Sequence, residues 1–143
     1  LTLPILYLSR YVIEHKENYY ARLIAVTREE DWEAWILYML EAVRDTSVRT
    51  LDKITAIRTL YEATRERVAA ELPKIYKREL IDVIFEQPYC RIENVVRTGI
   101  AKRQTASSYL KALAGLGILE ARRIGREAIY INPALLGALT ESG

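Results

Sequence analysis

Hydrophobic residues recur at steps of three and four along the first half of the chain, which is the spacing of one helix face. This spacing predicts a first helix from Pro4 to about Lys16 and a second, capped by Asn18, from Tyr19 to about Thr27. A third helix should run from Asp31 to about Glu71, because no Gly or Pro interrupts its apolar steps. At 1.5 Å per residue, roughly 40 residues would span roughly 60 Å.

The two halves of this long helix differ in character. Residues 32–43 are apolar nearly all the way round, so we expect them to be buried on several sides. Residues 51–72 carry one narrow apolar stripe among charged residues, a pattern typical of a spacer or a pairing surface. Ser47 and Thr50 weaken the stripe, which leaves a kink or break within 45–50 open. We expect a homodimer through 32–43 or 51–68, because monomers seldom expose large apolar patches.

The second half of the chain combines short helices with short strands. Pro73 should end the long helix, so we place a domain boundary there, between a helical segment of residues 1–73 and a domain of residues 74–143. The expected elements of the second domain are helices over 78–87 and 91–97, the turn Thr98-Gly99, a helix stopped by Leu116-Gly117, strands over 118–123 and 128–132 joined at Gly125-Arg126, and a helix over 134–139. This order predicts a mainly α fold that ends in a winged helix-turn-helix with a small β-hairpin.

The helix after Gly99 has two contrasting faces. Its apolar side comprises Ala106, Tyr109, Leu110 and Leu113. Its polar side comprises Gln104, Ser107, Ser108 and Lys111. Ala101 or Lys102 falls at its N-cap, where the lack of a Ser, Thr or Asp weakens the helix by about 1 kcal/mol. In the preceding helix, we expect Ile92, Val95 and Val96 to be buried.

Positive charge is concentrated in residues 97–127. This stretch holds seven basic and two acidic residues, a net charge of +5, whereas the whole chain carries +2 and the remainder therefore −3. A DNA duplex presents one negative charge per about 1.7 Å of its axis, so this stretch is a candidate phosphate-binding surface. The candidate DNA-binding residues are Lys102, Arg103, Gln104, Thr105, Ser107, Ser108, Lys111, Arg122, Arg123 and Arg126.

The residue types at these positions suggest how DNA would be contacted. Gln can bond adenine through two hydrogen bonds, and Arg or Lys can bond guanine or phosphate. The three hairpin arginines could grip phosphate or the minor groove. Two alternatives stay open: a polar face on a fold used to bind a protein, and a charged hairpin that keeps a sheet edge soluble.

Composition limits the other classes of function. No apolar run approaches the roughly 18 residues that a membrane span needs, and no signal peptide is visible, so we expect a cytoplasmic chain without membrane contact. The single Cys90 cannot form an internal disulfide, although its neighbour Arg91 leaves a lowered thiol pKa open. The lone His15 is expected to be a surface residue at a helix end, and we expect no metal site.

Two stretches of the chain carry a family resemblance. The first comprises residues 3–14 (LPILYLSRYVIE), the pair Tyr19-Tyr20 and residues 31–36 (DWEAWI). The second comprises residues 85–89 (FEQPY) and 101–107 (AKRQTAS). Together they resemble the C-terminal region of Fic-family proteins, which usually transfer AMP onto target proteins. The resemblance implies that residues 1–45 are the last helices of a truncated Fic domain, followed by an appended winged helix of regulatory character.

The catalytic part of that family has no counterpart here. Its loop, His-Pro-Phe-x-x-Gly-Asn-Gly-Arg, precedes the segment that resembles residues 3–14, and this sequence contains no such loop. His15 is followed by Lys16 and Glu17, so no catalytic residue is carried over. The resemblance implies that this chain is not itself an enzyme, that its parent is a protein AMP-transferase, and that ATP and Mg²⁺ belong only to the missing catalytic part, which would be a partner of this fragment.

Three hypotheses of function follow. The leading one is a dimeric, DNA-binding regulatory module of a Fic-family protein. The second is a winged-helix interaction module that positions target proteins for AMP transfer. The third is a stand-alone dimeric winged-helix transcription regulator.

Overall fold

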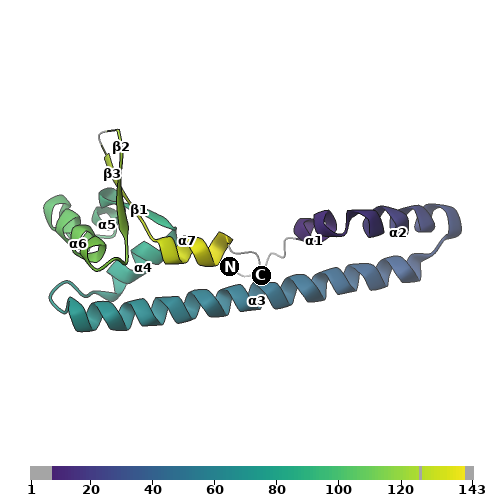
Figure 1. Cartoon of the computed structure of the whole chain (residues 1–143), viewed down its shortest axis with the longest axis horizontal. Helices are drawn as coiled ribbons and strands as arrows, with labels where there is room; N and C mark the ends of the chain where they lie inside the picture. Colours follow the sequence, from purple (N-terminus) through teal and green to yellow (C-terminus); the bar gives the residue numbers. More distant parts are fainter. Residues whose placement is uncertain (1–7, 126, 141–143) are drawn as a thin grey trace. The chain divides into compact units, whose positions relative to one another are not determined.

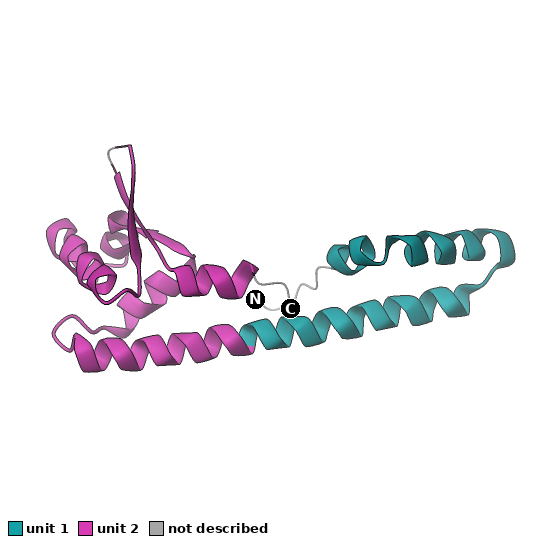
Figure 2. Cartoon of the chain, in the orientation of Figure 1, with its two compact units in different colours: residues 1–54 teal, residues 55–143 magenta. Residues whose placement is uncertain are grey.

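The computed structural model describes residues 8–125 and 127–140. Its helices are α1 (Ser9–Glu14), α2 (Lys16–Glu29), α3 (Trp32–Glu71), α4 (Arg78–Glu86), α5 (Ile92–Arg97), α6 (Arg103–Gly115) and α7 (Pro133–Thr140) (Figure 1). Its strands are β1 (Tyr89–Arg91), β2 (Glu120–Ile124) and β3 (Glu127–Ile131). The predicted mainly helical fold, with one long helix and a small sheet near the C-terminus, is confirmed. The chain divides into two compact units, residues 1–54 and 55–143, and α3 contributes to both (Figure 2).

Aromatic side chains pack α1 and α2 against α3 in the first unit. Tyr11, Tyr38 and Ala42 are buried together. The ring centroids of Tyr11 and Tyr38 lie 5.7 Å apart, and those of Tyr19 and Trp35 lie 5.4 Å apart. The buried Tyr38 hydroxyl has no hydrogen-bond partner in the described part of the chain, and its burial raises the pKa of that hydroxyl.

The helix boundaries of this unit differ from the prediction by a few residues. The predicted start of the first helix, at residues 4–7, lies outside the described residues. The second helix begins at Lys16 rather than Tyr19, so Asn18 lies inside it and does not cap it. The earlier start follows from His15, whose carbonyl already accepts a hydrogen bond from the Tyr19 N–H at 3.0 Å. His15 does lie at a helix end, but it is partly buried because its ring stacks on Tyr11.

The long helix α3 has no break at residues 45–50. Asp31 caps its start, since the Asp31 carboxylate accepts the Ala34 N–H at 3.2 Å. The Ser47 hydroxyl donates to the Val43 carbonyl, and the Thr50 hydroxyl donates to the Thr46 carbonyl, each at 2.7 Å. Both hydroxyls are therefore satisfied within the helix itself, which explains why they do not interrupt it.

Residues 32–43 were expected to be buried on several sides, and the described residues bury them on one side only. Within the described residues, Tyr38 and Ala42 are buried, whereas Trp32, Ile36 and Leu40 are more than half exposed. The reason is geometric, because α1 and α2 are short and pack on one side of α3. No described residue buries the opposite side.

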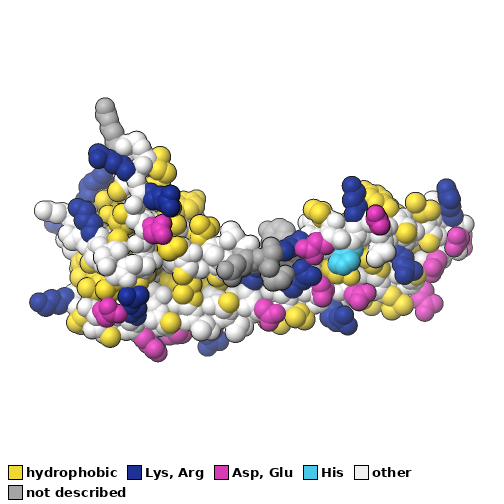
Figure 3. Space-filling model, viewed as in Figure 1, with side chains coloured by type: hydrophobic (Ala, Val, Ile, Leu, Met, Phe, Trp, Pro, Cys, Tyr) yellow, Lys and Arg dark blue, Asp and Glu magenta, His cyan; other side chains and the backbone are white. Residues whose placement is uncertain are grey.

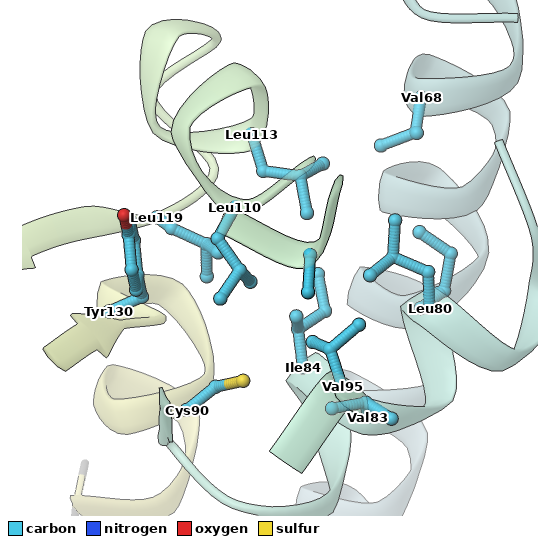
Figure 4. Packing of buried hydrophobic residues seen from close by; sticks show 12 residues of the cluster. Val68, Leu80, Val83, Ile84, Cys90, Val95, Leu110, Leu113, Leu119 and Tyr130 are labelled. Carbon is cyan, nitrogen blue, oxygen red and sulfur yellow. The ribbon is translucent and has the colours of Figure 1, made fainter. Parts of the chain in front are cut away.

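The second unit is built around one hydrophobic core, and Figure 4 shows its packing. The core residues are Val68, Leu80, Ile81, Val83, Ile84, Cys90, Val95, Ala106, Leu110, Leu113, Leu119 and Tyr130. Val95 is buried as predicted, but Ile92 is only partly buried and Val96 is exposed. A six-residue helix such as α5 packs through one side, and Val95 occupies that side.

The sheet contains a strand that the sequence did not predict. Its order is β1-β3-β2, and Cys90 of β1 and Ala121 of β2 both pair with Tyr130 of the central strand. β1 is only three residues long, too short for an alternating pattern. The two predicted strands are present with slightly shifted ends, and Gly125 adopts a positive φ of 63° at their turn.

Asn132 connects the end of the sheet to two helices. Its side-chain oxygen accepts the Leu135 N–H at 3.0 Å and so caps α7, while its amide nitrogen donates to the Ile84 carbonyl at 3.3 Å. Its backbone N–H donates to the Pro88 carbonyl at 2.8 Å. The hairpin is therefore fixed at its base to the body of the unit.

The second unit begins within α3. Val68 lies in its core, and the Tyr61 hydroxyl donates to the Asp82 carboxylate of α4 at 2.6 Å. The end of α3 at Glu71 agrees with the expected effect of Pro73. The division into domains 1–73 and 74–143 stays a prediction, distinct from this division by packing.

Candidate nucleic-acid interface

The orientation of α6 is set by its buried side. Ala106, Leu110 and Leu113 are fully buried in the core of the second unit. Gly99, with a positive φ of 76°, makes the turn that separates α5 from α6. Lys102 is the N-cap and makes no side-chain hydrogen bond there, as the sequence predicted. Because the inner face is fixed, the residues on the opposite face must point to solvent.

The polar residues of α6 are exposed with one exception. Lys102, Arg103, Gln104, Thr105, Ser108 and Lys111 are exposed, and Ser107 is partly buried. The Ser108 hydroxyl donates to the Gln104 carbonyl at 3.1 Å, so it is satisfied within the helix yet remains an available acceptor. Gln104 lies in the first turn of α6 and is exposed.

The β2–β3 hairpin adds basic side chains to the same unit. Every residue of β2 is exposed, including Arg122 and Arg123. The Arg122 guanidinium lies 3.3 Å from the Glu120 carboxylate, an exposed pair that solvent weakens. Arg126 lies outside the described residues. Figure 3 shows several Lys and Arg side chains gathered around this hairpin.

Two further basic residues of this unit, Arg97 and Lys77, were not among the candidate contacts from the sequence. Arg97, at the end of α5, is exposed and lines an open pocket of about 280 Å³ with Arg91, Glu93 and Asn94. Lys77 donates to the Ile100 carbonyl at 3.2 Å and so steadies the turn before α6. Their positive charge was visible in the sequence, but their places depend on contacts between distant residues.

Cys90 is a core residue rather than a reactive thiol. Burial, with a smaller contribution from the Glu86 carboxylate, raises the pKa of its thiol to about 11. The lowered pKa that Arg91 suggested is therefore wrong. The Arg91 guanidinium instead lies 3.6 Å from the Glu127 carboxylate of the hairpin.

The described residues contain neither a metal-binding cluster nor a membrane-spanning helix. No group of three or more His, Cys, Asp and Glu side chains gathers there in a way that could hold a metal ion. No helix of that part of the chain is long and apolar enough to cross a membrane.

The order of α4, α5, α6 and the β2–β3 hairpin is consistent with a winged-helix-like arrangement, in which α6 would be the second helix of the turn. Residues 60–135 match the family described as protein adenylyltransferase SoFic-like, C-terminal domain. Because this match covers just over half of the 143 residues, the chain belongs to that family. The resemblance to the C-terminal region of Fic-family proteins is thereby confirmed, and the match is to a C-terminal domain rather than to the catalytic one.

Proposed function

We propose that this chain is a DNA-binding regulatory module at the C-terminal end of a Fic-family protein. The observation that carries the proposal is the exposed polar face of α6. Three buried residues fix that helix, so that Arg103, Gln104 and Lys111 face solvent beside a basic hairpin. An anionic duplex is the partner whose chemistry fits this face best.

The distribution of charge supports a nucleic-acid partner. Residues 97–127 carry +5 and the rest of the chain carries −3, so the positive potential is local rather than general. Phosphate contacts fix the position of a protein on a duplex, and base contacts give sequence preference. Arg122 and Arg123 are suited to phosphate, whereas Gln104 is suited to an adenine edge.

A salt titration of duplex binding tests the proposal. If four basic residues contact phosphate, the logarithm of the binding constant should fall against the logarithm of salt with a slope of about −4. Fluorescence anisotropy of a labelled duplex gives both the affinity and the slope. Absence of binding at 50 mM salt, or binding that does not respond to salt, would overturn the proposal.

Single substitutions test whether duplex binding depends on the polar face of α6 or only on the overall positive charge of the chain. Lys111→Ala should weaken binding and reduce the salt slope by about 1. Arg58→Ala removes an equal charge from an exposed position on α3 and is the matched control, expected to leave binding unchanged. Equal losses in both variants would point to non-specific attraction.

The parent protein is proposed to be a protein AMP-transferase whose catalytic part, with ATP and Mg²⁺, lies outside this sequence. The family assignment supports this, since it is the C-terminal domain of a protein adenylyltransferase. The test is to read the codons upstream of Leu1 in the same frame. A catalytic loop there supports the proposal, and a native start codon near Leu1 favours the stand-alone regulator instead.

A protein-interaction module is the second candidate, favoured by one observation. Ile124, near the hairpin turn, is 64% exposed, and phosphate binding has no use for an apolar side chain there. Affinity capture with wild type, Arg103→Glu and Ile124→Glu would distinguish the candidates. Loss of a bound protein in these variants, without any duplex binding by wild type, would favour the interaction module.

A further inference from the structure

The last turns of α3 contain an arginine that binds two groups at once. The Arg67 Nε–H donates to the Glu71 carboxylate at 2.7 Å, and the Arg67 Nη2 donates to the Leu116 carbonyl at 3.0 Å. Glu71 is the last residue of α3, and Leu116 is the C-cap of α6. The guanidinium can join these two helix ends because it presents several donors in fixed directions.

The contact with Leu116 comes from outside α6, unlike the other hydrogen bonds at that end. The carbonyls of Ala112, Leu113 and Ala114 each accept an N–H group of the turn that follows the helix, at 3.1 Å or less. The Leu116 carbonyl accepts a donor from α3 instead. Because carbonyls at a helix C-terminus carry partial negative charge, a cation there stabilises the end and fixes its place.

The turn before α6 is held in a similar way. Lys77, the N-cap of α4, donates to the Ile100 carbonyl at 3.2 Å, two residues before the α6 N-cap. That N-cap, Lys102, makes no capping hydrogen bond of its own. Two cationic side chains from residues 67–77 therefore hold α6 at both ends, while its buried face anchors the middle.

Packing fixes the place from which Arg67 reaches α6. Its neighbour Val68 is fully buried, in the same core as Leu113 of the last turn of α6. Figure 4 shows Val68 and Leu113 entering this core from the two helices. The Arg67 and Glu71 side chains are about half exposed, so they lie at the rim of the core rather than within it.

We propose that Arg67, oriented by Glu71, is a positioning residue for duplex recognition, which sets the direction of α6 without itself touching DNA. This inference rests on the proposed DNA-binding function. Base contacts require donor–acceptor distances of about 2.7–3.2 Å and tolerate displacements of about 0.5 Å. The 13 residues of α6 span roughly 20 Å, so a tilt of about 5° at one end moves the other by roughly 2 Å.

Binding to two duplexes tests the proposal: the tightest one that wild type selects from a random-sequence library, and a scrambled duplex of the same composition. Arg67→Met keeps the apolar stem of the side chain. It should weaken binding to the selected duplex about fivefold or more, the smallest loss expected for one misplaced base contact. Binding to the scrambled duplex should stay within about twofold, with an unchanged salt slope, because no phosphate contact is lost.

Rescue by the conservative variant sharpens this test. Arg67→Lys should recover only part of the loss, because an ammonium can donate to the Leu116 carbonyl but lacks the fork that also holds Glu71. Glu71→Ala raises the net charge by one, so general attraction would tighten binding to both duplexes. Loss of the orientation of Arg67 should instead weaken binding to the selected duplex.

A neighbouring ion pair on the same helix supplies the matched controls. The Arg65 guanidinium lies 2.9 Å from the Glu62 carboxylate, and both belong to α3. Arg65→Met and Glu62→Ala make the same changes of charge and size as the variants of Arg67 and Glu71. Both control variants should match wild type within about twofold on the two duplexes.

Amide hydrogen exchange gives a readout that does not need DNA. The N–H groups of Ile118 and Leu119 donate to the Leu113 carbonyl at the end of α6. They should exchange about fivefold or more faster in Arg67→Met than in Arg65→Met, because the end of α6 opens more often. Amides of α4, in the same core, should exchange equally in both variants, which excludes a general loss of stability.

The results that would overturn this inference differ from those that would overturn the proposed function. Equal exchange in Arg67→Met and Arg65→Met, equal affinities of these variants for the selected duplex, or a salt slope lowered by about 1 in Arg67→Met would each refute the positioning role and leave DNA binding standing. Absence of duplex binding by wild type would overturn the proposed function itself, and the role of Arg67 in recognition with it.

Discussion

Two tyrosine hydroxyls differ in whether the fold gives them a hydrogen-bond partner. The Tyr38 hydroxyl is buried without a hydrogen-bond partner in the described residues, whereas the Tyr61 hydroxyl donates to Asp82 at 2.6 Å. Tyr38→Phe should raise the free energy of unfolding by about 1 kcal/mol, because it removes an unsatisfied polar group. Tyr61→Phe should lower it by about 1 kcal/mol. Urea unfolding measures both changes, with tryptophan fluorescence as the signal for Tyr38→Phe and circular dichroism for Tyr61→Phe. A loss of stability in Tyr38→Phe would contradict the argument.

The raised pKa of the Cys90 thiol makes stability depend on alkaline pH. Because the folded-state pKa, about 11, lies above the ordinary value of 9.0, the folded chain holds this proton more tightly than the unfolded chain does. The resulting stability is present below pH 9 and is lost between pH 9 and 11. Between pH 9 and pH 11, the free energy of unfolding of wild type should therefore fall by about 2–3 kcal/mol more than that of Cys90→Ala. Parallel unfolding curves against pH, with equal slopes for both chains, would contradict this.

At the scale of elements, the uncapped start of α6 suggests a compromise between stability and binding. Lys102→Ser should supply the missing N-cap and raise the free energy of unfolding by about 0.5–1 kcal/mol. The same change should weaken duplex binding, because a cation beside the groove is lost. Lys74→Ser, at an exposed position between α3 and α4, is the control for the charge change. Denaturation and anisotropy on the same samples measure the two effects, and tighter duplex binding by Lys102→Ser would contradict the argument.

The elements that the sequence predicted well are those with a long periodic signal. α3 and α6 appear close to their predicted bounds, and the outer face of α6 could be predicted because it is the complement of Ala106, Leu110 and Leu113. β1 was missed because three residues after Pro88 carry no period. Val96 was wrongly placed in the core, since apolar character alone does not say which side of a six-residue helix packs.

Tertiary contacts determine which parts of the candidate site could not be predicted from the sequence. The Lys77 contact with Ile100 and the Arg91 contact with Glu127 join residues that are far apart in the sequence. Composition revealed the charge of these residues but not their partners. The double role of Asn132, as a cap and as a link to α4, also depends on which chain segments meet in the fold.

At the scale of the whole molecule, the candidate nucleic-acid interface belongs to one of the two units. The basic face of α6 and the hairpin lies in residues 55–143, whereas α1 and α2 lie in residues 1–54. The core that turns the polar side of α6 outward is built from buried residues of the second unit alone. A substitution in the first unit should therefore leave duplex binding unchanged.

Ile13→Glu should test this separation of the two units. Ile13 lies on α1 and is 73% exposed, so the substitution should keep the fold and leave the affinity for a duplex within about twofold of wild type. Lys111→Ala, on the polar face of α6, should weaken binding at the same salt concentration, because a cation that faces the duplex is lost. Anisotropy titrations of the three chains give the comparison, and a loss of affinity by Ile13→Glu equal to that of Lys111→Ala would show that the two units are coupled.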